Sequence, residues 1–320
     1  MHHYCLFTTQ FFARTFPEQV RVAFQEHIPR LAFKNAFLMD AILLVSMIHL
    51  GSTDPVTLES LPIYLYRGQA LRTLREAIVD VAPQTVHAVL GASLLHTTVS
   101  FATDRVTRQP GLWIANRLTL VLGQRNFRSS GFVFPTQSGD LSPGSRNDMQ
   151  SPNSLYGSFT DLPDSVHGII ATDIQRALAQ EEEKYNGTWT DGDVLHRAAS
   201  ELGRLIAVLE YPREDSWLEK KIKAWAFDIV PLEFVELVRQ ARPPALVILA
   251  YYIAFLPFLP DSWLYESVAN HDLEEIGNMI DTSWEEYLEV PKTALRTTSR
   301  TALARVLVSS LPLRETRGLE

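Results

Sequence analysis

An apolar stretch near residue 250 constrains this chain more than any other feature. Residues 242–258 read RPPALVILAYYIAFLPF, and from Ala245 to Leu256 the only polar side-chain groups are two tyrosine hydroxyls. Apolar side chains cover every face of the helical wheel, which is typical of a helix surrounded by protein. Prolines favour a start at Pro243 and a stop before Pro257. At about 1.5 Å per residue the helix spans roughly 18 Å, too short to cross a bilayer.

We therefore predict an all-α fold, a single-domain bundle of many helices around this buried central helix, with a hydrophobic pocket. Tyr251 and Tyr252 combine an apolar ring with a polar tip, which suits the wall of a ligand pocket. They can equally be ordinary core tyrosines whose hydroxyls bond to the protein, and the residues alone leave both interpretations open.

The composition of the chain limits which classes of protein it can belong to. The chain has 320 residues, of which 46% are hydrophobic, a net charge of −8 and a single cysteine, Cys5. An acidic surface repels phosphate, which argues against direct binding of nucleic acid. One cysteine excludes an internal disulfide framework and a cysteine-rich zinc site. The first residues lack a signal-peptide pattern and no 18-residue apolar window occurs, so we expect a cytoplasmic or nuclear protein, not secreted, without a membrane span.

The organisation along the chain is helical, with no alternating strand pattern above chance. We expect one helical domain over residues 1–291 and a C-terminal extension over 292–320. Residues 124–165 are rich in Ser, Pro, Gly and Asn, so we predict a mobile loop that interrupts the domain. Motifs such as GxSxG, HExxH and GxxxxGK[ST] are absent, and we predict no metal site and no cofactor.

Polar residues on the apolar helices are the candidate functional groups. Asp40, Ser46 and His49 interrupt the helix predicted over residues 36–50, and His96 lies on another apolar helix. A buried carboxylate needs a partner or a wet cavity, and a buried histidine is usually a core residue with hydrogen-bond partners. The functional alternative is a mostly apolar pocket with a few placed donors.

Several stretches, taken in order, resemble one family. MHHYCLFTT, IPRLAFKNAFLMDAILLVSMIHLG and YLYRGQALRTLREAI, followed by PLEFVELV and RPPALVILAYYIAFL, resemble the C-terminal domain of fungal zinc-cluster transcription factors of the sterol uptake control protein type. The resemblance covers about residues 2–291. It implies an all-α regulatory domain with a hydrophobic pocket that binds sterol in some members, and it implies homodimer formation.

This sequence departs from the family pattern at several points. The family's DNA-binding module needs six cysteines, so we expect this chain to lack it. Asn35 and Ala36 stand where the family often has histidine and proline, Asp40 stands where it often has histidine, and Ser267 and Val268 replace a common glycine and tryptophan.

Three hypotheses follow, of which the third is that the chain is the excised regulatory half of a larger transcription factor. In the first, the chain binds a hydrophobic small molecule, a sterol, terpenoid or polyketide-like compound, without touching DNA; the candidate contacts are Phe37, Ser46, His49, Tyr251, Tyr252, Phe255 and Trp263. In the second, it is a metal-independent cyclase or pericyclase of natural-product biosynthesis that works by orienting its substrate and donating to developing charge. The candidate catalytic residues are then His49, Asp40, His96 and Tyr251.

Overall fold

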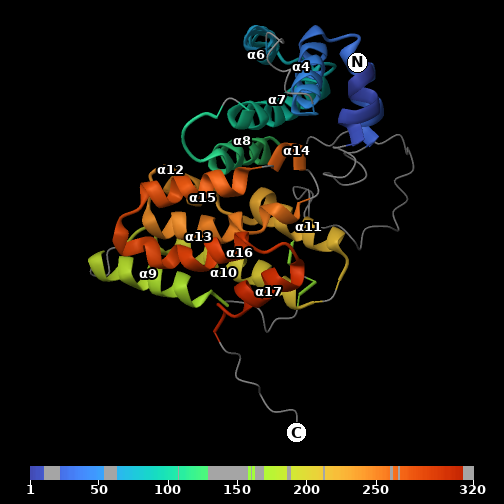
Figure 1. Cartoon of the computed structure of the whole chain (residues 1–320). Helices are drawn as coiled ribbons and strands as arrows, with labels where there is room; N and C mark the ends of the chain where they lie inside the picture. The colour runs from blue at the N-terminus through green and yellow to red at the C-terminus, as the bar shows by residue number, and fades with distance from the viewer. Residues whose placement is uncertain are drawn as a thin grey trace, which may run out of the picture. The chain divides into compact units, whose positions relative to one another are not determined.

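A computed structural model (Figure 1) describes residues 1–10, 22–53, 63–106, 108–128, 158–159, 161–162, 169–185, 189–211, 213–259, 262–265 and 267–312. Within these ranges the regular structure is helical and no β-strand occurs, so the predicted all-α class is confirmed. Most of the predicted loop, residues 124–165, lies outside the described residues.

The helices gather into two compact units. Unit 1 comprises Met1–Leu155 and Asp261–Leu264, and unit 2 comprises Tyr156–Pro260 and Tyr265–Glu320. The main division falls within residues 124–165, where the apolar pattern of the flanking helices stops. The prediction of one domain over residues 1–291 does not include such a division.

The described part of unit 1 contains four long helices. Its elements are the π-helical turns η1 (Tyr4–Thr8) and η2 (Ala23–His27), the α-helices α3 (Ile28–Ala32), α4 (Ala36–Thr53), α6 (Ile63–Val79), α7 (Val86–Val106) and α8 (Trp113–Arg128), and most of α14 (Ser262–Tyr265). Helix α4 packs against α6 and α7, and α7 packs against α8. Leu38, Ile42 and Val45 on α4 are fully buried, because this helix is apolar on nearly every face.

Helix α7 is apolar enough to compare with a membrane span. Among the described residues, Val86–Arg105 is the one single helix with the length and composition to cross a bilayer, and 72% of its apolar window is buried within the protein. In unit 2 the helical segments Leu232–Arg239 and Pro243–Phe258 pass the same test together, but they are bent by 109° relative to each other. Buried core helices pass this test as well, so neither segment marks a clear membrane span.

Unit 2 is built around a single helix. Its elements are α9 (Thr172–Tyr185), α10 (Gly192–Ala207), η5 (Val208–Glu210), α11 (Asp215–Ala224), the π-helical turn η6 (Trp225–Ile229), α12 (Leu232–Arg239), α13 (Pro243–Ile253), η7 (Leu256–Phe258), α15 (Val268–Met279), η8 (Thr282–Leu288), α16 (Glu289–Leu295) and α17 (Arg300–Val308). Helices α16 and α17 belong to the packed part of this unit, and α17 contacts α10.

Helix α13 is the predicted central helix. It packs against α9, α10, α12, α15, η8 and α16. From Ala245 to Leu256 no residue is more than 1% exposed. Pro243 occupies the first helical position, where its missing N–H leaves no hydrogen bond unmade. Surrounding this stretch on all sides removes every apolar side chain from water, which is the main source of its stability.

Candidate functional site

The residues predicted as functional divide between the two units. Unit 2 holds Tyr251, Tyr252 and Phe255, and unit 1 holds Phe37, Asp40, Ser46, His49, His96 and Trp263. Within unit 1 they form two separate groups. The first surrounds His49 and the second surrounds His96.

The first group is an aromatic cluster drawn from three distant segments. The His49 ring lies 4.8 Å from that of Trp263, centroid to centroid, at 38°. His3 lies 5.1 Å from His49 and 5.2 Å from Phe7. The Nδ1 atom of His49 shares a 3.0 Å hydrogen bond with the hydroxyl of Thr8, on η1. The structure therefore brings together two predicted ligand contacts, His49 and Trp263, that are far apart in sequence.

The histidines of this cluster are uncharged at neutral pH. Burial, followed by the nearby His3, lowers the pKa of His49 to about 4. Burial also lowers the pKa of His3. A neutral imidazole presents an aromatic face without the cost of a buried charge, so the cluster is suited to contact apolar groups.

The second group is polar and joins α4, α6 and α7. The hydroxyl of Thr73 lies 3.3 Å from Asp40 Oδ2, and Arg67 Nη2 donates to the hydroxyl of Ser100 over 3.2 Å. His96 is 8% exposed, and its Nε2 atom has no hydrogen-bond partner among the described residues. Asp40 thus has a protein partner, whereas His96 keeps a nitrogen that a further group could bind.

The charge state of His96 follows from its surroundings. Burial, followed by the positive charge of Arg67, lowers the pKa of His96, and the net result is a pKa of about 4. A hydrogen bond to the Ala70 carbonyl and the negative charge of Asp40 act in the opposite direction without compensating for burial. His96 is therefore neutral at pH 7.

Two further predicted residues of α4 lie apart from these groups. The hydroxyl of Ser46 donates to the Ile42 carbonyl over 2.7 Å, so its donor is occupied by the backbone of its own helix. Phe37 lies in the first turn and is half-buried. Serine in a helix often bonds to the carbonyl four residues earlier, which the sequence pattern alone does not distinguish from an inward-facing donor.

The two tyrosines of α13 donate to the protein. The hydroxyl of Tyr251 lies 3.2 Å from Asp173 Oδ2, and that of Tyr252 lies 3.4 Å from the Ile222 carbonyl. Burial, followed by the negative charge of Asp173, raises the pKa of Tyr251 well above its ordinary value. The Tyr251 phenol is therefore a neutral hydrogen-bond donor at any physiological pH.

Trp225 packs its ring beside α13. Its ring stacks on Tyr252 with centroids 4.4 Å apart and an interplanar angle of 21°, and it meets Phe234 edge-on at 6.0 Å. Trp225 and Phe255 are fully buried. Tryptophan at position 225 is visible in the sequence, but its stacking partner is not, because 26 positions separate it from Tyr252 on another helix.

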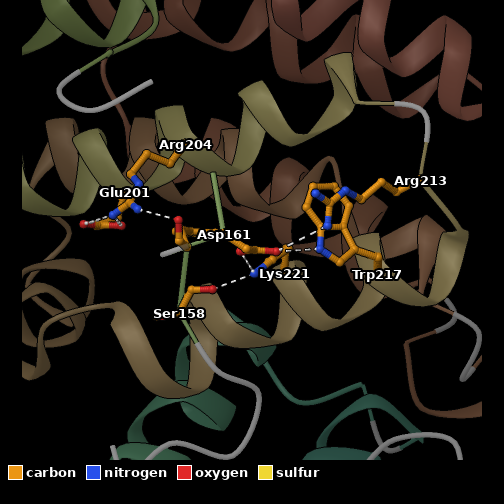
Figure 2. Close-up of polar contacts among 8 residues, drawn as sticks. Ser158, Asp161, Glu201, Arg204, Arg213, Trp217 and Lys221 are labelled. Carbon is orange, nitrogen blue, oxygen red and sulfur yellow. Dashed lines mark hydrogen bonds and ion pairs between the residues drawn. The ribbon is translucent and has the colours of Figure 1, made fainter. Parts of the chain in front are cut away.

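A charged network outside the predicted set anchors residues 158–162 (Figure 2). Lys221 donates to the Ser158 carbonyl over 2.6 Å and pairs with Asp161. The indole N–H of Trp217 donates to Asp161 over 2.8 Å. Burial acts to raise the pKa of Asp161, but the hydrogen bonds from Lys221 and Trp217 outweigh it and hold that pKa below its usual value.

Arg204 completes the network on α10. Its Nη2 atom donates to the Phe159 carbonyl over 2.8 Å, and its Nη1 atom bonds to Glu201 (Figure 2). Phe159 is 1% exposed, and the cations of Arg204 and Lys221 lie 5.3 and 5.7 Å from its ring centroid. The network fixes one end of the predicted loop to α10 and α11 and has the character of a structural anchor.

Comparison with known proteins places the chain beside fungal zinc-cluster transcription factors, so the resemblance inferred from the sequence is confirmed. A "Zn(2)-C6 fungal-type transcription factor" of Gibberella zeae is 25% identical over 321 residues, which covers 91% of this chain and 60% of that relative. No family model matches the chain.

Two shorter matches are to proteins named for the control of sterol uptake. "Sterol uptake control protein 2" of Candida albicans is 37% identical over 68 residues, 21% of this chain and 9% of the relative. The protein of the same name from Saccharomyces cerevisiae is 33% identical over 96 residues, 29% of this chain and 10% of the relative. The match to the Gibberella zeae protein therefore covers about 60% of that relative's length, and the matches to the two sterol uptake control proteins cover about a tenth of theirs.

Proposed function

We propose that this chain is a regulatory domain that binds an apolar small molecule, a sterol, terpenoid or polyketide-like compound, and does not itself contact DNA. The observation that carries the proposal is the similarity to a fungal transcription factor over 91% of the chain. The names of the partial matches, which concern control of sterol uptake, support the ligand class. A nuclear or cytoplasmic location follows from the same relatives.

The charge of the chain supports a role without direct DNA contact. A net charge of −8 opposes binding to phosphates, and a single cysteine cannot form a zinc cluster of six cysteines. Regulation by this chain would then pass through ligand-dependent association with other proteins, and a second copy of the chain is one such partner.

We assign the ligand to the interior of unit 2, along α13, with Tyr252, Phe255 and Trp225 as its wall. Support comes from the apolar surface on every face of α13 and from the uncharged aromatic stack beside it. Burial of roughly 300 Å² of ligand hydrocarbon at about 25 cal/mol per Å² supplies about 7–8 kcal/mol, before the cost of association is subtracted. We therefore expect dissociation constants in the micromolar range or weaker.

The protonation states favour binding over acid–base catalysis. A general base works best with a pKa near the operating pH, and the pKa values of His49 and His96 are about 4. Catalysis by orientation alone would not depend on these groups, so the cyclase alternative is decided by looking for a product.

The proposal is tested with purified protein and three probes: a fluorescent sterol, a triterpenoid and a linear polyene. Saturable binding of at least one probe, recovered chemically unchanged, is expected. Absence of saturable binding to all three would overturn the proposal, and recovery of an isomerised probe would replace it with the cyclase.

Hydrogen exchange with and without the bound probe locates the ligand. We expect slower exchange of amides in η6 and α13. Protection confined to η1 and α4 would instead place the ligand at the cluster of His49 and Trp263 and refute our assignment. As a matched pair of variants, Tyr252→Leu should weaken probe binding, whereas Tyr64→Leu should not, because Tyr64 is 68% exposed on α6.

A further inference from the structure

Trp225 has a buried polar atom without a hydrogen-bond partner among the described residues. The residue is fully buried, and the atom is its indole Nε1. Trp217, two turns earlier along the same helical segment, donates its indole N–H to Asp161 over 2.8 Å. A buried donor without a partner costs about 1–3 kcal/mol, so such groups in native proteins call for an explanation.

The unpaired N–H lies in the aromatic wall that we assign to the ligand. Its ring stacks on Tyr252 at 4.4 Å, and the Tyr252 hydroxyl is occupied by the Ile222 carbonyl at 3.4 Å. These residues therefore combine apolar ring faces with one buried donor, the Trp225 N–H, that makes no hydrogen bond to the described residues. A mostly apolar site with few placed polar groups is the usual composition of a site for small molecules.

The backbone at Trp225 is also unusual. Trp225 opens the π-helical turn η6, in which the amide of Val230 bonds to the Trp225 carbonyl over 2.8 Å, five residues back. A π-helical turn holds more residues than an α-helical turn, and such turns occur frequently at functional sites.

We propose that the Trp225 indole N–H donates a hydrogen bond to the single oxygen of a neutral, otherwise hydrocarbon ligand, such as a sterol hydroxyl or a terpenoid ketone. The inference rests on the proposed binding function and narrows its ligand class. A carboxylate is disfavoured because one neutral donor cannot compensate a buried anion. Lys223, two residues before Trp225, has a buried ammonium group that is already paired with Glu219.

The inference is tested with two ligands and two variants. The ligands are cholestanol and cholestane, which differ only in the hydroxyl group. Trp225→Phe keeps a stacking ring and removes the N–H, and Trp217→Phe is the matched control on the same helical segment. Wild type should prefer cholestanol by about tenfold, the effect of one hydrogen bond worth about 1.4 kcal/mol. Trp225→Phe should abolish that preference, and Trp217→Phe should retain it.

The outcomes separate this inference from the proposed function. Equal weakening of both ligands in Trp225→Phe, or an unchanged preference, would overturn the hydrogen bond while leaving the binding function in place. Failure of wild type to bind either ligand would instead count against the binding function itself. The indole proton resonance of Trp225 in wild-type protein gives a readout that does not depend on a variant folding. It should move downfield with cholestanol and not with cholestane, and no difference between the two would overturn the inference.

Discussion

Acidification should weaken unit 1 through His96. In the folded protein burial lowers the pKa of this histidine from 6.5 to about 4, and in the unfolded chain the ring returns to its ordinary value. The unfolded state therefore binds a proton that the folded state rejects. The contribution of the neutral His96 side chain to the free energy of unfolding is fully present above pH 6.5. It is lost progressively as the pH falls from 6.5 toward 4.

The size of the effect follows from the interval between the two pKa values. Each pH unit between them is worth about 1.4 kcal/mol, so lowering the pH from 6.5 to 5 removes about 2 kcal/mol from the free energy of unfolding. Because His96 is only 8% exposed, solvent screening reduces this figure little. His49, with a pKa of about 4, should add a loss in the same direction.

The assay compares guanidinium unfolding at pH 7 and pH 5 in wild type, His96→Gln and His2→Gln, with hydrogen exchange of α4 and α7 as the readout for unit 1. Glutamine does not titrate, so the decrease in the free energy of unfolding between pH 7 and pH 5 should be about 2 kcal/mol smaller in His96→Gln than in wild type. His2 is exposed, so His2→Gln should behave as wild type. An identical pH dependence in wild type and His96→Gln would refute the assignment of a neutral, buried His96.

Three substitutions test the packing. Gly203→Ala should destabilise unit 2 by about 3 kcal/mol, measured by thermal unfolding, because the new Cβ would lie 1.7 Å from the Ile169 carbonyl oxygen. Gly68→Ala, where a Cβ meets nothing within 4 Å, should raise the unfolding temperature, since alanine favours a helix by about 1 kcal/mol. Asp161→Asn should lower stability by about 1–2 kcal/mol above pH 4, where the charged carboxylate pairs with Lys221. Below the depressed pKa of this carboxyl the wild-type side chain is itself neutral, so the substitution removes no charged partner of Lys221 and should leave stability unchanged.

Helix positions could be predicted from the sequence because local patterns determine them. The charge-free run around Tyr251 became α13, and the apolar helix predicted over residues 36–50 lies within α4 (Ala36–Thr53). Gly51 is an exception. The sequence favours a helix end there, but α4 continues to Thr53, because Gly51 is buried and packing outweighs the intrinsic preference of glycine.

The contacts within the candidate sites could not be predicted, because they join segments far apart along the chain. His49 meets Trp263 only after the chain has passed through unit 2, and Asp40 meets Thr73 on the next helix. Hydrophobic periodicity identifies which side of a helix is buried but carries no information about which other helix covers it. The same limit applies to Phe159, whose ring lies beside the cations of Arg204 on α10 and Lys221 on α11.

Whether a buried polar group can contribute to binding depends on what it already bonds. A ligand that takes the hydroxyl of Tyr251 must displace Asp173, so one hydrogen bond replaces another and little free energy is gained. A ligand that takes the Trp225 N–H replaces nothing and recovers the cost of about 1–3 kcal/mol that the empty donor imposes. Among the polar groups beside α13, Trp225 should therefore control selectivity, while Tyr251 and Tyr252 contribute the faces of their rings. The sequence shows all three residues as equivalent amphipathic aromatics, and only their hydrogen-bond partners separate them.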